Sequence, residues 1–283
     1  MRHPSSRRAS HRATIPVLNL ASRHHVPVPW HLLVTPPLPG ATNMAIDEAL
    51  LLRARETGQG SIRVYTWANP TISMGRHQAG RGIWDLDRCR ERGVDVVRRL
   101  TGGRGILHHQ ELTYAVAAPV REGRGLREDY GAITSLLSHT LHHLGIGATA
   151  AAPAGRMPIP AAAPCFELPA RDELVVDGRK LVASAQLRED GAYLQHGSLL
   201  NHDNQGWLAE LATIPMPTTP AATVVGLIGR ELTAERWAAA MCDAVREVWH
   251  ADLVPVHVDA CVPPATLASL TARYLDPAWT WRR

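Results

Sequence analysis

The sequence predicts an α+β fold with a mixed, largely antiparallel sheet flanked by helices. One observation is that Asp177-Gly178 and Asp190-Gly191 separate three strand-like segments, and Asp-Gly is a strong signal for a two-residue hairpin turn. Another is that apolar residues recur at helical spacing in longer segments before and after these strands. Because hairpins mixed with helices are typical of antiparallel sheets, we expect this class rather than a doubly wound parallel fold.

The first elements are a strand over residues 30–34 and, after a Pro/Gly turn, a helix over residues 44–55. Asn43 is the expected cap of this helix, because its side-chain oxygen can accept from a free N–H of the first turn. Asp47 and Glu48 would then lie near the positive end of the helix dipole. We therefore expect a helix that is stabilised at its N-terminal end.

Two strands are predicted next, over residues 61–67 and 71–74, with Asn69-Pro70 between them. Residues 61–67 alternate as a half-buried strand should. Because Asn-Pro marks a turn, the two strands are expected to form a hairpin.

The rest of the chain is assigned by the same patterns. Helices are expected over residues 85–92, 130–144, 234–249 and 264–274, and strands over residues 95–98, 112–116, 173–176, 180–186 and 192–200. Residues 148–164, mostly Ala and Pro, are expected to form a mobile loop.

Length and composition fit one soluble globular domain over residues 29–283. The chain has 283 residues, of which 45% are apolar and 20% charged, which is enough for a sizeable core. No apolar run approaches the ~20 residues needed to cross a bilayer, which excludes a membrane-spanning role. The net charge of +4 permits an acidic partner without requiring one.

Residues 1–28 are expected to be a disordered basic tail. No Asp or Glu precedes Asp47, whereas five arginines lie among Ser, His and Pro. Such a segment has too little apolar content to fold alone. A transit peptide is the alternative, and a disordered tail or an over-long gene start is favoured over it.

The four cysteines are far apart in the sequence. They are Cys89, Cys165, Cys242 and Cys261. Because no pair has a short spacing, we expect neither a disulfide framework nor a zinc knuckle. Free thiols are compatible with a reducing cytosol, so a cytoplasmic protein is expected.

Lys180 is the only lysine among the 30 Lys and Arg residues, and it follows Cys165 in the chain. An amine can act as acid, base or localised electrophile, whereas a guanidinium stays protonated and spreads its charge over a planar fork. A cysteine thiolate is a very good nucleophile, and a neighbouring ammonium favours it. Cys165 and Lys180 are the predicted catalytic pair, acting through an acyl-enzyme. A buried, inert Cys165 is the alternative.

A strand that runs into a glycine-rich turn is the second candidate site. Adjacent glycines let backbone N–H groups approach a ligand, and arginines supply bidentate donors for a carboxylate or phosphate. The segment is neither a Walker loop nor a dinucleotide fingerprint, and taken alone it fits a structural corner equally well. Its candidate binding residues are Arg98, Arg99, Thr101, Gly102, Gly103, Arg104, Gly105 and His108.

The fifteen histidines do not indicate a metal site. The adjacent pairs, such as His108-His109, point to different faces of a strand or helix and cannot chelate together from one face. No His-Glu-x-x-His pattern occurs. Arginines are spread along the chain, aromatic residues make up only 5%, and no nucleic-acid recognition motif is present. We expect neither a metal nor a nucleic-acid partner.

Four segments within residues 30–200 occur in the same order as the motifs of a known family. They are Asn43-Met44-Ala45-Ile46-Asp47-Glu48-Ala49; Tyr65-Thr66-Trp67 with Ser73-Met74-Gly75-Arg76; residues 98–108; and Gly178-Arg179-Lys180 followed by Ser184-Ala185-Gln186 and His196-Gly197-Ser198-Leu199-Leu200. In this combination the chain resembles the catalytic domain shared by lipoate-protein ligases, biotin-protein ligases and octanoyltransferases. The resemblance implies the same mixed or antiparallel sheet flanked by helices. Beyond these segments, the helices expected from the sequence pattern make residues 234–283 a helical C-terminal part.

Cys165-Phe166, followed by Glu173 and residues 174–180, resembles the octanoyltransferases that have a lipoate-ligase-like sequence. This resemblance implies that Cys165 is acylated by octanoyl-acyl carrier protein and that Lys180 holds the acyl carbonyl. The acceptor would be a lysine of a lipoyl domain or of the glycine-cleavage H protein, with no cofactor and no membrane partner. The implied substrate-binding residues are those of the glycine-rich segment together with Ser184, Ala185, Gln186, His196 and Gly197.

Two departures from the family pattern concern the pocket. Ala183 stands where the family usually has glycine, and His109 where aspartate is frequent. Both would reshape the site and change the acyl-chain preference. Two other functions stay open: an ATP-dependent lipoate-protein ligase, which would use ATP and Mg²⁺, and a non-catalytic module that binds acyl groups or carrier proteins.

Overall fold

The computed structural model describes residues 30–151, 164–166 and 172–283. Within these ranges the large sheet has eight strands, in the order β11 (Leu253–Pro255), β1 (Trp30–Val34), β2 (Ser61–Tyr65), β6 (Glu111–Pro119), β10 (Ala192–Leu200), β9 (Arg179–Glu189), β8 (Leu174–Val176) and β7 (Thr149–Ala150). A small sheet beside it has the order β4 (Asp95–Arg98), β3 (Thr71–Met74) and β5 (Ile106–His108).

Most neighbouring strands run antiparallel, which confirms the predicted fold class. In the large sheet only β1 pairs in parallel, with β11 on one side and β2 on the other. In the small sheet β3 is parallel to β4 and antiparallel to β5. The parallel pairs lie at one edge of the large sheet, so the centre is built from antiparallel neighbours.

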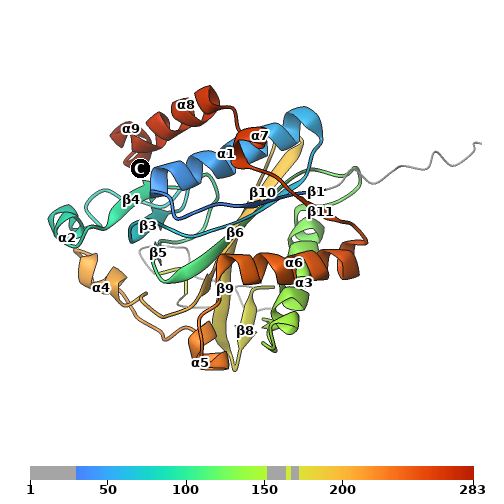
Figure 1. Ribbon diagram of the computed structural model, residues 1–283. Coiled ribbons are helices and arrows are strands. Elements are labelled where there is room, and N and C mark those ends of the chain that lie inside the picture. The colour runs from blue at the N-terminus through green and yellow to red at the C-terminus, as the bar shows by residue number, and fades with distance from the viewer. Residues whose placement is uncertain (1–29, 152–163, 167–171) are drawn as a thin grey trace, which may run out of the picture.

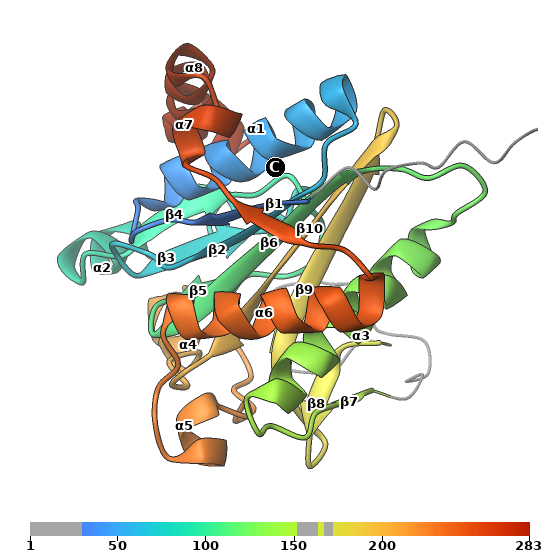
Figure 2. The same cartoon turned by 45° about the vertical axis from the view of Figure 1, so that its right-hand side comes forward.

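Helices cover both faces of the large sheet (Figures 1 and 2). One face packs against α1 (Gly40–Thr57), on which α8 (Pro264–Leu275) packs in turn, and the other against α3 (Leu126–His143) and α6 (Ala234–Trp249). The shorter helices are α2 (Leu86–Glu91), α4 (Trp207–Leu211), α5 (Val224–Ile228), α7 (Val258–Cys261) and α9 (Pro277–Thr280).

Strand β6 shows how the two faces divide the core. Tyr114 and Val116 pack in the cluster that contains α3 and α6, whereas Ala115 and Ala117 pack with α1. Side chains alternate between the faces of a strand, so a central strand covered on both sides is apolar throughout. The core therefore has two layers, one on each side of the sheet.

Strand β2 is fully buried, so the prediction of a half-buried strand was wrong. The residue that makes it look amphipathic is Arg63, whose guanidinium donates to Asp47 of α1 over 2.8 Å. A buried cation is tolerated when a carboxylate pairs with it. The alternation reflected this buried ion pair and not contact with water.

The predicted hairpin of residues 61–67 and 71–74 does not form. Strand β2 pairs with β1 and β6 in the large sheet, and β3 pairs with β4 and β5 in the small one. Both edges of β2 are taken by neighbours distant in sequence, so β3 pairs elsewhere. The turn at Asn69-Pro70 thus joins two sheets.

Asn43 does not cap α1, because the helix begins at Gly40 and Pro39 is its N-cap residue. The Asn43 amide is buried in the first turn and donates to the carbonyls of Leu38 and Thr66, each over 3.1 Å. Its side-chain oxygen accepts from Arg63. Asn43 therefore ties the helix to the loop that follows β2.

The two Asp-Gly turns are confirmed. Asp177 and Gly178 have φ of 49° and 73°, and Asp190 and Gly191 have φ of 49° and 81°. Positive φ at both central residues defines the type I′ turn, which matches the twist of the flanking strands. These turns fix the β8–β9 and β9–β10 hairpins.

Helices α6 and α8 agree closely with the predicted residues 234–249 and 264–274, whereas α3 begins earlier, at Leu126. The predictions for residues 1–28 and for most of the loop at 148–164 lie outside the described residues; within that loop, Thr149–Ala150 forms β7. Among the residues described, no helix is long and apolar enough to span a membrane.

Candidate functional site

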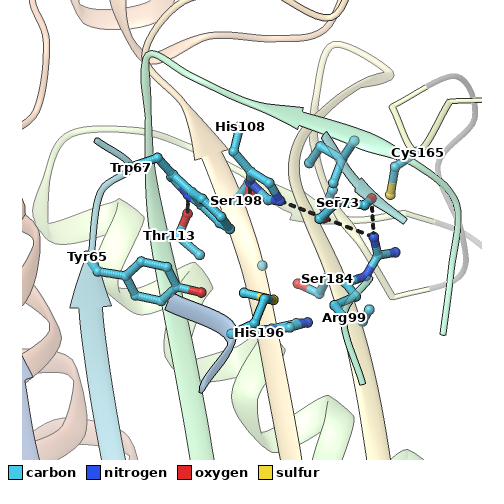
Figure 3. A pocket seen from close by; sticks show the side chains of 15 residues that line it. Tyr65, Trp67, Ser73, Arg99, His108, Thr113, Cys165, Ser184, His196 and Ser198 are labelled. Carbon is cyan, nitrogen blue, oxygen red and sulfur yellow. Dashed lines mark hydrogen bonds between the residues drawn. The ribbon is translucent and has the colours of Figure 1, made fainter. Parts of the chain in front are cut away.

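A narrow cavity of about 30 Å³ lies where β3 and β5 of the small sheet approach β9 and β10 (Figure 3). It brings together seven of the predicted site residues, from segments far apart in sequence: Arg99, His108, Cys165, Ser184, Ala185, His196 and Gly197. Met44, Trp67, Ile106 and Ala183 supply apolar wall, so the cavity suits a ligand with an apolar part.

His108 is held from both of its ring nitrogens. Nδ1 lies 2.7 Å from Glu111 Oε1, and Nε2 lies 2.7 Å from Ser73 Oγ. Trp67 stacks on the ring with centroids 3.9 Å apart. Because Glu111 also accepts from Thr113 and Ser198, its carboxylate fixes the orientation of His108 in the wall.

His196 has a similar arrangement on the opposite wall. Its Nδ1 lies 2.9 Å from Asp47 Oδ2, and its Nε2 lies 2.7 Å from Thr101 Oγ1. Burial lowers the pKa of His196 despite the bond to Asp47. Burial raises the pKa of Asp47, but the hydrogen bond from His196 and the charge of Arg63 outweigh it, and the net direction is downward. His196 is therefore neutral and Asp47 charged at neutral pH.

Arg99 lines the cavity and is buried. Its Nη1 donates to the carbonyl and hydroxyl of Ser73 over 2.7 and 3.1 Å. Its Nη2 donates to the carbonyls of Gly102 and Arg104, each over 2.8 Å. Through these four bonds the guanidinium holds the glycine-rich turn in a conformation that surrounds the Arg99 side chain.

Cys165 is half-buried, and its side chain lines the cavity beside Ser73 and Arg99 (Figure 3). Its backbone N–H donates to the carbonyl of Gly105 over 2.9 Å. The next residue, Phe166, is buried against Ile106. The glycine-rich turn therefore fixes the backbone of Cys165, from which the thiol projects into the cavity.

Lys180 approaches the same segment from the other direction, but it does not line the cavity. Its Nζ donates to the carbonyl oxygen of Cys165 over 2.5 Å and lies 2.6 Å from Glu173 Oε2. Both side chains of this ion pair are buried, with exposures of 2% and 4%. The sole lysine thus contacts the backbone of Cys165.

The remaining predicted binding residues lie outside the cavity wall. Arg98 donates to the carbonyls of Gly75, Gln78 and Thr280 over 2.7 to 2.8 Å, and burial lowers its pKa to about 10. It connects β4 to the C-terminal segment. The glycine-rich turn is formed by Gly102, Gly103 and Arg104. Thr101 is hydrogen-bonded to His196. Gln186 lies on β9, one residue beyond the part of the strand that lines the cavity.

Of the two residues that depart from the family pattern, Ala183 lines the cavity, whereas His109 packs beside Trp207 outside it. Sequence reasoning missed Ser73 and Glu111 as partners of His108, and Thr113 as a donor to Glu111. Ser73 lies in one of the segments that resemble the family, but no motif or spacing in the sequence indicated a role for Glu111. Its role depends on the register of β6 against β10.

Comparisons with known proteins agree on one family. The lipoyl protein ligase A/B catalytic domain matches residues 39–246. The octanoyltransferase LipM of Kyrpidia tusciae is 35% identical over 274 residues, which cover 90% of this chain and 99% of that protein. The octanoyltransferase LipM of Moorella thermoacetica is 44% identical over 178 residues, which cover 60% and 64% of the two chains.

Solved structures show the same fold. A lipoate-protein ligase A bound with ATP superposes with a TM-score of 0.73 at 18% identity, covering 89% of this chain and 98% of that one. A bipartite lipoate protein ligase from Thermoplasma acidophilum gives 0.70 at 18% identity, with 90% and 96% covered. At this identity the likeness extends to the fold alone.

Proposed function

The chain belongs to the lipoyl protein ligase A/B catalytic-domain family, and on that premise we propose that it transfers an octanoyl group through a thioester on Cys165. It is an acyltransferase, as its octanoyltransferase relatives are. The proposed donor is octanoyl-acyl carrier protein. The proposed acceptor is a lysine of a lipoyl domain or of the glycine-cleavage H protein, and the proposed location is the cytoplasm.

The observation that carries this proposal is a thiol that opens into a cavity with apolar walls. Cys165 shares the cavity with Met44, Ile106 and Ala183, which suit an alkyl chain, and with His108 and Arg99, which suit a polar carbonyl. Acyl transfer requires a nucleophile that lies beside an apolar surface for the alkyl chain and beside polar groups for the carbonyl. Cys89 and Cys261 are buried elsewhere in the core.

The chemistry balances without a cofactor. The Cys165 thiolate attacks the thioester carbonyl, a new C–S bond forms, and the carrier thiolate leaves and takes up a proton. The acceptor amine then attacks the octanoyl-cysteine, an amide forms, and Cys165 is released as a thiol. Thioester exchange is close to isoenergetic and amide formation is downhill, so no ATP is needed.

Lys180 and Glu173 support the reacting segment in this scheme. The bond from Nζ to the carbonyl of Cys165 fixes the backbone from which the thiol projects. Positioning of this kind contributes to rate because a small misplacement of a reacting group is costly. The direct contact between Lys180 and the acyl carbonyl that the resemblance implies stays a prediction.

The nearest rival is an ATP-dependent ligase that acts on a free acid. The deciding experiment is intact-mass analysis after the protein is mixed with octanoyl-acyl carrier protein in the absence of nucleotide. We expect an octanoyl adduct that is absent from Cys165→Ser and kept by Cys242→Ser, a cysteine on α6 at the far face of the sheet.

Two outcomes would overturn the proposal. No adduct, together with ATP-dependent modification of an acceptor by free octanoate or lipoate, would favour the ligase. No adduct and no modified acceptor under either condition would favour a non-catalytic binding module.

A further inference from the structure

We propose that Ser73, activated by His108 and Glu111, is a second nucleophile of the cavity and hydrolyses activated acyl esters and thioesters. This activity goes beyond the proposed transfer through Cys165 and does not depend on the thiol. It follows from a serine, a histidine and a carboxylate that are connected in the order that nucleophilic catalysis requires.

The three groups form one chain of short contacts. Ser73 Oγ lies 2.7 Å from His108 Nε2 (Figure 3), and His108 Nδ1 lies 2.7 Å from Glu111 Oε1. The residues come from β3, β5 and β6 in turn. The chain of contacts is therefore assembled when the small sheet packs against the large one.

The partners of this chain assign its hydrogen atoms. A carboxylate only accepts, so His108 Nδ1 donates to Glu111 and Nε2 is left as the acceptor. Arg99 Nη1 donates to Ser73 Oγ over 3.1 Å, and a guanidinium has no acceptor. The hydroxyl hydrogen of Ser73 therefore points to His108 Nε2, which is the orientation in which an imidazole takes a proton from a hydroxyl.

Glu111 is held in place for this role. The side chains of His108 and Glu111 are 7% and 0% exposed, and Thr113 and Ser198 each donate to Glu111 Oε1 over 2.7 Å. A fixed, buried carboxylate orients the imidazole and stabilises the imidazolium that forms when His108 accepts a proton. Glu111 is thus a positioning residue for His108.

Ser73 lines the cavity that also contains Cys165. The other two serines of the cavity wall have different partners: Ser184 bonds the Tyr114 hydroxyl, and Ser198 donates to Glu111. Because the cavity is narrow, about 30 Å³, we expect short acyl groups to reach the Ser73 hydroxyl most easily.

A second chain of the same kind provides an internal comparison. Thr101 Oγ1 lies 2.7 Å from His196 Nε2, and His196 Nδ1 lies 2.9 Å from Asp47 Oδ2. Thr101, however, does not line the cavity. We therefore expect no acylation of Thr101, because an ester cannot reach its hydroxyl.

The reaction balances with water as its only co-reactant. Ser73 Oγ attacks the acyl carbonyl, a C–O bond forms, and the hydroxyl proton passes to His108 Nε2 and on to the leaving alkoxide or thiolate. Water then attacks the acyl-serine with His108 as the base. The ester C–O bond breaks, Ser73 regains its proton, and a carboxylic acid leaves.

The test uses the Cys165→Ala protein, which lacks the thiol, and p-nitrophenyl acetate, an ester with a short acyl group. Release of p-nitrophenol is measured together with peptide mapping after an acid quench. We expect hydrolysis above the rate without protein and an acetyl adduct on Ser73, and the further change Ser73→Ala should remove both. Ser138→Ala, on α3 and outside the cavity wall, should keep both.

His108 and Glu111 are tested in the same Cys165→Ala background. His108→Ala should lower the rate by about 10²- to 10⁴-fold, and imidazole in the buffer should restore part of it, which a merely structural role would not allow. The Ser73→Ala protein in the same imidazole buffer is the control. Glu111→Gln should lower kcat and leave KM within about twofold, because the carboxylate does not touch the ester.

Several results would overturn the proposal. They are no hydrolysis above the rate without protein, an unchanged rate in Ser73→Ala, no restoration by imidazole, or acetylation of Thr101 or Ser184 with Ser73 unmodified. Adduct mapping needs no change at Ser73, so it decides the matter even if Ser73→Ala does not fold. Because the thiol is absent from every protein in this test, the result is independent of whether Cys165 is octanoylated.

Discussion

At the scale of single residues, each histidine of the cavity wall has a buried carboxylate of its own. Glu111 holds His108, and Asp47 holds His196. Asp47 also accepts from Arg63 and Tyr65, so one carboxylate joins helix α1, strand β2 and the cavity. Burial and the Asp47 charge raise the pKa of Tyr65, which keeps its hydroxyl a donor. The site therefore depends on a residue that does not itself line the cavity.

Asp47→Asn tests this dependence. It leaves Arg63 and its charge in a fully buried position without a counter-ion, which costs about 3–5 kcal/mol of unfolding free energy. Urea denaturation at neutral pH measures the loss. Asp87→Asn, in the exposed pair with Arg90, should change the free energy by no more than ~1 kcal/mol. Equal effects of the two substitutions would contradict the role of Asp47.

At the scale of elements, the β9–β10 hairpin supplies one wall of the cavity, and its packing requires a glycine. A Cβ on Gly197 would lie 2.4 Å from the Ala183 carbonyl and 2.8 Å from a ring carbon of Tyr114. The first contact is with backbone of the neighbouring strand, which cannot move without disturbing the ladder. Gly197 thus allows β9, β10 and Tyr114 to approach closely beside the thiol.

Gly197→Ala should therefore destabilise the protein by about 1–3 kcal/mol through overpacking and slow the formation of the octanoyl adduct. Thermal denaturation and the rate of adduct formation measure the two effects. Gly102→Ala is the matched control, because nothing lies within 4 Å of the added Cβ and φ there is not positive. A stable, fully active Gly197→Ala variant would show that β9 and β10 separate easily.

At the scale of the whole molecule, the burial of histidines predicts how stability depends on pH. Burial lowers the pKa of His31, His109 and His196 from the ordinary 6.5. The unfolded chain then binds more protons than the folded one as the pH falls below about 6.5. Their contribution to stability is complete above that pH and is lost as the pH decreases.

We expect the free energy of unfolding to be lower at pH 5.5 than at pH 7.5, as measured by urea denaturation at each pH. His196→Gln should have a shallower pH dependence over this range, because it removes one group that binds a proton only on unfolding. An unchanged slope in His196→Gln would mean that His196 is not the source of the effect.

The sequence determined the local structure where a short-range interaction decides it. The Asp-Gly dipeptides predicted two type I′ turns, since few other residues tolerate positive φ at both central positions. Helices α6 and α8 followed from apolar periodicity and lie at the predicted residues. The order of the motifs identified the family, since the same residue types recur there at matching positions.

Only the tertiary structure decided which strands pair and which charges meet. The partners of β2 and β3 are distant in sequence, so a turn signal between them could not reveal that they belong to different sheets. Likewise, the chain shows a lone lysine after a cysteine, but not that Glu173 pairs with it or that Ser73, His108 and Glu111 meet. Backbone turns depend on adjacent residues, whereas electrostatic compensation depends on contacts that form only when the sheets pack together.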